Sequence, residues 1–161
     1  MRDFIITTDS NSDLPENYIK KLGTIIIPQY YSFGDTVYGD ELHMPPAEFY
    51  ERMKSGELPQ SQANNPAVIE DKFRAVLDRG LDIIHIAFSS ALSGSYNNVC
   101  MVANELKEDY PEAKITIIDS LNVSLGETLL LLHATELKEN GCSYEEIVTD
   151  LEQYKHHINV Q

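Results

Sequence analysis

The sequence has only two cysteines, no tryptophan and few basic residues. Cys100 and Cys142 are far apart and form no C-x-x-C motif, so we interpret them as ordinary thiols. Lysine and arginine total 12 against 26 acidic residues, which gives a net charge of −14. Such a charge repels phosphate backbones and anionic membranes, so we expect no nucleic-acid partner and no docking on lipid surfaces.

Long hydrophobic runs are also missing. The longest, Leu129–Leu132, is far shorter than the ~20 residues that span a bilayer, and we expect no transmembrane segment. The apolar stretch after Met1 is too short for the core of a secretory signal, so we expect a cytoplasmic protein. With 161 residues, of which 42% are hydrophobic, the chain is long enough for one domain with its own core.

Motifs for metals and nucleotides are lacking as well. The five histidines have no ligand spacing, and there is neither a G-x-G-x-x-G motif nor a P-loop. Asp9–Asp13 alternates acidic and small polar residues, but it lacks the glycine and final glutamate of a calcium loop. We favour a capping role for this segment, keep a phosphoryl-accepting Asp9 as an alternative, and predict no metal and no cofactor.

Short apolar strands alternate with longer helices along the chain. This alternation predicts an α/β fold, with a mainly parallel sheet covered by helices on both faces. Leucines cover more than one stripe of the helix that begins at Asn122, so we expect that helix to be deeply buried. A capping box, Ser143-x-x-Glu146, marks the start of the last helix. The expected strands are residues 4–8, 24–28, 82–88 and 114–118, with extended segments at 30–33 and 36–38, and the expected helices are 17–22, 45–54, 66–78, 92–108, 122–139 and 143–157.

Three of the strands end in polar segments. These are Asp9–Ser12, Ser89–Ser95 and Asp119–Ser120. The carboxyl ends of parallel strands lie at one edge of a sheet, where ligands bind. Ser89–Ser95 leads into a helix, whose free N–H groups attract anions, so we expect a site for a carboxylate or a single phosphate. The alternative is that these serines only cap the helix.

At these residues the sequence resembles the DegV family. Five motifs occur in the family's order. They are Thr8-Asp9-Ser10-Asn11-Ser12-Asp13-Leu14-Pro15, Ile27-Pro28 with Phe33-Gly34-Asp35 and Tyr38, Leu58-Pro59-Gln60-Ser61-Gln62, Ser89-Ser90-Ala91-Leu92-Ser93-Gly94-Ser95-Tyr96, and Ile118-Asp119-Ser120 with Ser124-Leu125-Gly126. The family's threonine in P-T-S-Q is replaced here by Gln60, which puts the head-group contacts in doubt, and Ser95 stands where threonine is commoner.

The resemblance implies a two-domain α/β protein that holds one fatty acid between its domains and presents the carboxylate to a fatty acid kinase. It implies a carrier rather than an enzyme. The tunnel walls would include Ile27, Phe33, Leu92 and Leu125. The ligand-binding residues that we carry over or place at the rim are Ser93, Ser61, Gln62, Gly94, Ser95, Asp9, Ser10, Ser89, Asp119 and Phe33.

Residues 1–161 would then be the family's N-terminal domain, with the C-terminal domain absent after Gln161. The chain end, from Tyr154, leaves a helix and stops in an apolar stretch, which is consistent with truncation or a separately encoded partner. Burial of an acyl chain contributes about 0.8 kcal/mol per CH₂. One open face forfeits much of it, so we expect this chain alone to bind fatty acid weakly or not at all, or to expose an apolar face that drives homodimerisation. The alternative is an enzyme-type domain, similar to the dihydroxyacetone kinase substrate domain, acting on a small polyol or phosphorylated substrate.

Overall fold

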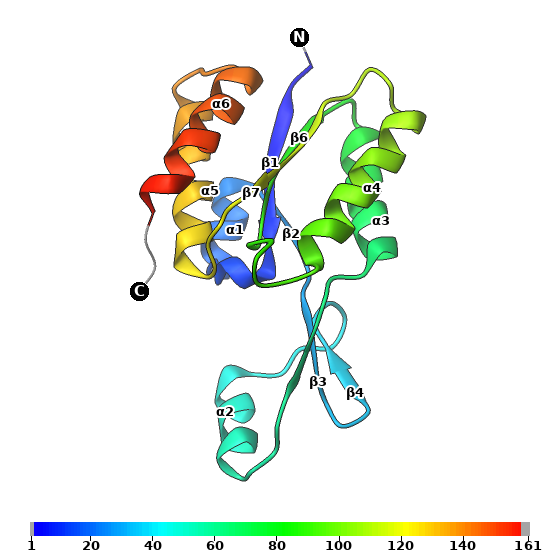
Figure 1. Cartoon of the computed structure of the whole chain (residues 1–161), viewed down its shortest axis with the longest axis vertical. Helices are drawn as coiled ribbons and strands as arrows, with labels where there is room; N and C mark the ends of the chain where they lie inside the picture. The colour runs from blue at the N-terminus through cyan, green and yellow to red at the C-terminus, as the bar shows by residue number, and fades with distance from the viewer. Residues whose placement is uncertain (1, 159–161) are drawn as a thin grey trace.

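The computed structural model describes residues 2–158 and contains a larger body and a smaller lobe (Figure 1). The body is built on a four-stranded sheet whose strands are all parallel, in the order β2-β1-β6-β7. Its strands are β1 (Phe4–Asp9), β2 (Ile25–Ile27), β6 (Asp82–Ala87) and β7 (Ile115–Asp119). The predicted α/β class and the mainly parallel sheet are confirmed.

Helices cover both faces of this sheet, as the alternation predicts. One face is covered by α1 (Glu16–Leu22), α5 (Leu125–Glu139) and α6 (Tyr144–Tyr154), which is followed by the 3₁₀ turn η2 (Lys155–His157). The other face is covered by α3 (Pro66–Leu77) and α4 (Ser95–Asp109). Successive residues of β6 point to opposite faces, so Ile84 and Ile86 pack against the first group and Ile83 against the second.

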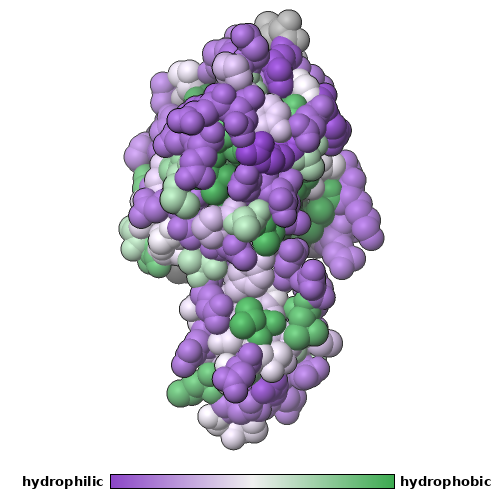
Figure 2. Space-filling model, turned by 90° about the vertical axis from the view of Figure 1, so that its right-hand side faces the viewer, coloured by the Kyte–Doolittle hydropathy of each residue, from purple (hydrophilic) through white to green (hydrophobic). Residues whose placement is uncertain are grey.

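The smaller lobe interrupts the body between β2 and α3. It consists of β3 (Tyr30–Phe33), β4 (Thr36–Tyr38), α2 (Pro46–Lys54) and β5 (Gln60–Gln62). The strands form an antiparallel sheet in the order β4-β3-β5. The hairpin turn at Gly34 and Asp35 is confirmed, whereas β5 was not predicted, because Gln60-Ser61-Gln62 is polar and exposed throughout. Figure 2 shows hydrophobic side chains at the surface of this lobe among polar ones.

The predicted helices are all present, with shifted ends. Ser143 accepts a hydrogen bond from the N–H of Glu146, and Glu146 accepts one from the N–H of Ser143, so the capping box is confirmed. The expectation that α5 is deeply buried holds for its inner face and fails for its outer face. Leu125 and Leu129 lie one turn apart on its outer face and are 64% and 51% exposed, while the inner face carries Leu130, Leu131 and Ala134.

Two other expectations concern a membrane-spanning helix and the end of the chain. No helix within residues 2–158 has the length and apolar character that crossing a bilayer requires. The apolar stretch expected at the chain end falls mostly on residues 159–161, which lie outside the described residues.

Candidate functional site

A cleft of about 890 Å³ separates the carboxyl edge of the parallel sheet from the smaller lobe. The loops after β1 and β6 form one wall, and β3, β5 and α2 contribute the other. The cleft therefore lies at the edge where the rule for parallel sheets leads us to expect a ligand site. Its lining residues are Ser10, Asn11, Asp13, Gln29, Tyr30, Tyr31, Gly39, Leu42, His43, Met44, Phe49, Pro59, Ser61, Gln62, Ala63, Phe88, Leu92, Ser93, Gly94 and Val123.

The cleft brings together five of the ten predicted site residues. Ser10 follows β1, Ser93 and Gly94 precede α4, and Ser61 and Gln62 lie on β5 across the cleft. Residues that are more than thirty positions apart in sequence therefore face a common space. That three of the hydroxyl groups line it is consistent with a polar ligand group at this position.

The side chain of Ser93 is hydrogen-bonded to Ser95. Its Oγ accepts a hydrogen bond from the N–H of Ser95 at 3.1 Å and lies 2.9 Å from the Oγ of Ser95, to which it donates. Gly94 is the residue before α4, and no side-chain cap bonds the helix there. The view that these serines only cap the helix is therefore incomplete, because Ser93 also lines the cleft.

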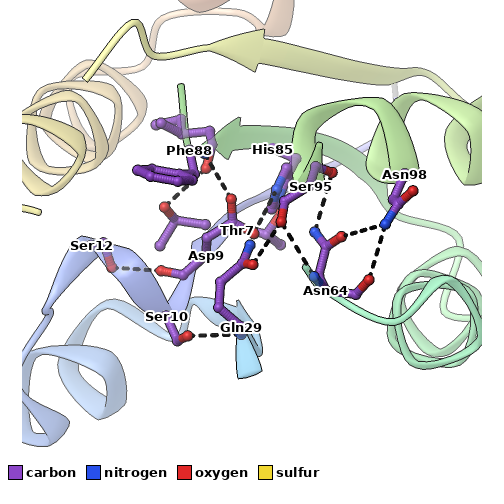
Figure 3. A network of polar contacts seen from close by, with 12 residues as sticks. Thr7, Asp9, Ser10, Ser12, Gln29, Asn64, His85, Phe88, Ser95 and Asn98 are labelled. Atoms are coloured by element: carbon purple, nitrogen blue, oxygen red, sulfur yellow. Dashed lines mark hydrogen bonds and ion pairs between the residues drawn. The ribbon is translucent and has the colours of Figure 1, made fainter. Parts of the chain in front are cut away.

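Four other predicted rim residues do not line the cleft, and their side chains contact other parts of the protein instead. The carboxylate of Asp9 is fully buried, and its Oδ2 accepts the N–H of Phe88 at 2.7 Å (Figure 3). Asp119 accepts the N–H groups of Ser90 and Leu121 at 3.1 and 3.2 Å. Ser89 is 3% exposed and Ser95 is fully buried. The arrangement with Asp9, Ser93 and Asp119 around one cleft is thus only partly present, because both carboxylates hold loops in place.

Phe33 is also displaced from its expected position. It is 3% exposed and packs edge-on against Tyr31 and Phe49, with the guanidinium of Arg52 lying 4.3 Å from its ring centroid. It forms the core of the smaller lobe instead of a cleft wall. Ile27 is likewise buried in the body, in the cluster under α3 and α4. Of the expected tunnel residues, Leu92 lines the cleft and is 63% exposed.

Apart from Leu92, the remaining lining residues were not predicted as site residues. Six of them lie on β3 and in the loop between β4 and α2, which carry no polar strand-end signal. Among the described residues that line the cleft there is no lysine or arginine; His43 is exposed there, and Asp13 contributes a carboxylate.

A buried acidic group lies beneath this edge. Glu127, in the first turn of α5, is fully buried, and its Oε1 accepts the hydroxyl of Thr8 at 2.6 Å and the N–H of Asp9 at 3.1 Å. Burial, with the nearby charge of Asp9, raises the pKa of Glu127 to about 9. The carboxyl is therefore protonated near neutral pH, which removes the cost of an unpaired buried charge.

His85 is packed within its strand, as its alternation predicts. It is fully buried, its Nδ1 lies 2.9 Å from Oγ1 of Thr7, and its Nε2 lies 3.5 Å from Oδ1 of Asp9. It also meets the ring of Phe73 edge-on at 5.6 Å. No group of three or more histidine, cysteine or acidic residues within residues 2–158 is arranged to hold a metal ion.

The sequence and fold are similar to those of known proteins. The model of the DegV family matches residues 3–161. A DegV domain-containing protein of Clostridium perfringens is 34% identical over 160 residues, which cover 98% of this chain and 55% of the relative. Another, from Caldanaerobacter subterraneus, is 30% identical, with coverage of 92% and 52%. The chain thus spans about half the length of the curated relatives it matches.

Solved structures agree with this similarity. A stearic-acid-binding protein of Eubacterium ventriosum matches with a TM-score of 0.86 and 30% identity, over 92% of this chain and 52% of that one. A fatty-acid-binding protein of the same family from Thermus thermophilus matches with a TM-score of 0.85 and 27% identity, over 97% and 54%. Both of these neighbours are described as binding fatty acids.

Proposed function

The chain belongs to the DegV family, and from this membership and the cleft we propose that it binds the head group of a long-chain fatty acid. The observation that carries the proposal is the meeting of Ser93 and Ser61 in one cleft at the carboxyl edge of the sheet. In this proposal Ser93, Ser61 and Gln62 donate hydrogen bonds to the carboxylate, and Gly94 lets it approach the backbone. The fatty-acid-binding neighbours support the ligand class.

The acyl chain leaves the head group along the apolar part of the cleft. Tyr30, Tyr31, Leu42, Met44 and Phe49 lie on the lobe side, and Leu92 and Val123 lie on the body side. These residues cover one side of the acyl chain. We propose that residues 1–161 form the family's N-terminal domain and that the remaining burial comes from a second domain.

In the same proposal the protein is a cytoplasmic carrier and not an enzyme. The bound carboxylate is presented to a fatty acid kinase, which phosphorylates it, and the carrier itself supplies only positioning. The cleft fits this role, because Ser93 has no histidine base bonded to it among the described residues.

The direct test is the substitution Ser93→Ala, with Ser90→Ala as the control. Ser90 is an exposed serine of the same loop that does not line the cleft; its hydroxyl donates to Asp119, so this variant controls for the loss of a hydrogen bond in the loop without the loss of a cleft hydroxyl. Isothermal titration with decanoate, a soluble fatty acid, measures the dissociation constant of each variant. Loss of a hydrogen bond to a charged group is worth about 1.5–3 kcal/mol, so Ser93→Ala should weaken binding by about 10–100-fold. Equal affinities for Ser93→Ala and the wild type would refute the head-group assignment.

One observation favours a second candidate, an enzyme-type domain acting on a small polyol or phosphorylated substrate. His43 lines the cleft and is exposed, although its sequence position in a loop did not predict this. A histidine in the site is what that reading requires. Native mass spectrometry of the bacterially produced protein separates the two. A co-purifying fatty acid supports the carrier, and an empty site that turns over a phosphorylated substrate, with the turnover lost in His43→Ala, supports the enzyme.

A further inference from the structure

Ser95 has its hydrogen-bonding groups occupied inside the protein. It is fully buried. Its hydroxyl donates to Oε1 of Gln29 at 2.7 Å, and accepts from Ser93 at 2.9 Å and from the N–H of Asn64 at 3.3 Å. Figure 3 shows Gln29 and Asn64 reaching Ser95 from different segments. A ligand cannot bond this hydroxyl without displacing one of these partners, so the role carried over for Ser95 as a ligand contact does not fit.

The partners of Ser95 lie where the chain enters and leaves the smaller lobe. Gln29 precedes β3 and Asn64 follows β5, and we call these two positions the neck. Asn64 is 2% exposed, and its Nδ2 also donates to the carbonyl of Ser95 at 3.3 Å. Asn98, further along α4, donates to the carbonyl of Asn64 at 3.0 Å. Both positions of the neck are therefore hydrogen-bonded to the first turn of α4, next to Ser93.

We propose that Ser95 is the positioning residue of the head-group site. By bonding both positions of the neck, it keeps the smaller lobe placed so that Ser61 and Gln62 face Ser93 across the cleft. The inference rests on the proposed function for the identity of the head group, but the positioning of the lobe follows from the hydrogen bonds alone.

The same bonds couple the ligand to the lobe. Ser93 has a single hydroxyl proton, and in this structure its hydroxyl donates a hydrogen bond to Ser95. When Ser93 donates to a ligand carboxylate instead, the N–H of Asn64 is the donor that Ser95 Oγ keeps, and that neck bond becomes stronger. Because coupling between two sites is reciprocal, a ligand that strengthens the neck contacts must bind more weakly when those contacts are removed.

The neck also contains one unsatisfied donor. Within residues 2–158, Nε2 of Gln29 is buried and has no hydrogen-bond partner. A buried donor without an acceptor is unfavourable. Gln29 also lines the cleft, so this donor lies next to the space that the ligand would occupy.

Hydrogen exchange at the amide of Asn64 reports on the neck without any ligand. We expect Ser95→Ala to speed this exchange about tenfold while β6 is unchanged, and Ser95→Thr, which keeps the hydroxyl, to restore the slow rate. Ser90→Ala, in the same loop, should leave it unaltered. If Ser95→Ala does not fold, Gln29→Ala removes the bond from Ser95 to Gln29 and, by freeing that side of the neck, should also speed exchange at Asn64. An unchanged rate at Asn64, or an equal increase throughout β6, overturns the positioning role.

Titration with decanoate then tests the coupling. The expected result is slower exchange at Asn64 when the wild type is saturated, and about tenfold weaker binding by Ser95→Ala with near-normal binding by Ser95→Thr. Equal affinity for Ser95→Ala and the wild type overturns the coupling. If the wild type binds no decanoate while Ser95→Ala still loosens the neck, the fatty-acid function and the coupling fail but the positioning of the lobe stands.

Discussion

The body and the smaller lobe are stabilised in different ways. The body has two clusters of buried, mainly aliphatic side chains, one on each face of its sheet. In the lobe α2 has no buried residue, and the packing depends on an aromatic group formed by Tyr31, Phe33, Tyr38 and Phe49. The body should therefore unfold as one unit, while the lobe opens locally at lower cost. A rigid wall and a more mobile wall would then enclose the ligand.

The largest effect is expected from a core substitution in the body. Phe73 is fully buried between α3 and the sheet. Phe73→Ala removes a ring from a closely packed site, and we expect the free energy of unfolding to fall by about 3–5 kcal/mol. Urea unfolding followed by circular dichroism measures this. A loss below 1 kcal/mol would mean that the body is not the stable unit of the comparison.

A second effect in the body depends on pH. The pKa of Glu127 is raised to about 9 by burial and by Asp9, against 4.5 for an ordinary glutamate. A raised folded-state pKa means that stability is fully present below about 4.5 and is lost as pH rises through about 9. Glu127→Gln keeps the acceptor for Thr8 but cannot ionise.

We expect Glu127→Gln to exceed the wild type in free energy of unfolding by roughly 1–3 kcal/mol at pH 8 and to match it near pH 4. Chemical unfolding at a series of pH values gives both curves. Parallel curves for the two proteins would show that Glu127 is not the group responsible. Because this group lies under the sheet edge, the lobe should show no matching dependence.

The lobe is tested by Phe33→Ala. The ring is 3% exposed and is covered by Phe49 and Arg52, so its loss should disorder the lobe. The body should lose less than about 1 kcal/mol in global unfolding, because a locally opened lobe contributes little to the global transition. Amide exchange across β3, β4 and β5 should rise at least tenfold while β6 is unaltered. Equal acceleration in β6 would erase the distinction between the two regions.

The smallest effect on stability is expected from Leu125→Ser. Leu125 is 64% exposed on the outer face of α5, and exposed substitutions usually change stability by less than about 0.5 kcal/mol. The same variant tests the expectation, drawn from the sequence, that an apolar face of this chain drives homodimerisation. Sedimentation velocity should show a wild-type dimer that Leu125→Ser weakens. A monomeric wild type would remove that expectation and leave only the unchanged stability.

Sequence patterns predicted the body better than the lobe. Apolar β-branched strands and amphipathic helices depend on burial, which periodicity reports, and the capping box at Ser143 is a local signal. The strand β5 is polar and exposed, so nothing in its sequence distinguishes it from a loop. Its pairing with β3 is a tertiary contact.

The cleft residues that could be predicted are those whose place follows from their position at the end of a strand or in a family motif. The strand-end rule placed Ser10, Ser93 and Gly94 at the cleft, and the resemblance added Ser61 and Gln62. The strand-end rule could not tell which carboxylates face the cleft and which face the protein interior. Asp9 was therefore assigned to the ligand, although it accepts the N–H of Phe88. Glu127 was invisible because a single acid in a leucine-rich helix has no pattern of its own.

The central claim is that Ser93 and Ser61, from the two walls, contact one fatty-acid carboxylate. The carbon resonance of decanoate labelled with ¹³C at the carboxyl group tests this most directly, because it detects weak contacts. The resonance should shift on addition of the wild-type protein, and the shift should be strongly reduced by Ser93→Ala and by Ser61→Ala but kept by Ser90→Ala. The same shift with all four proteins, or none with the wild type, would contradict it.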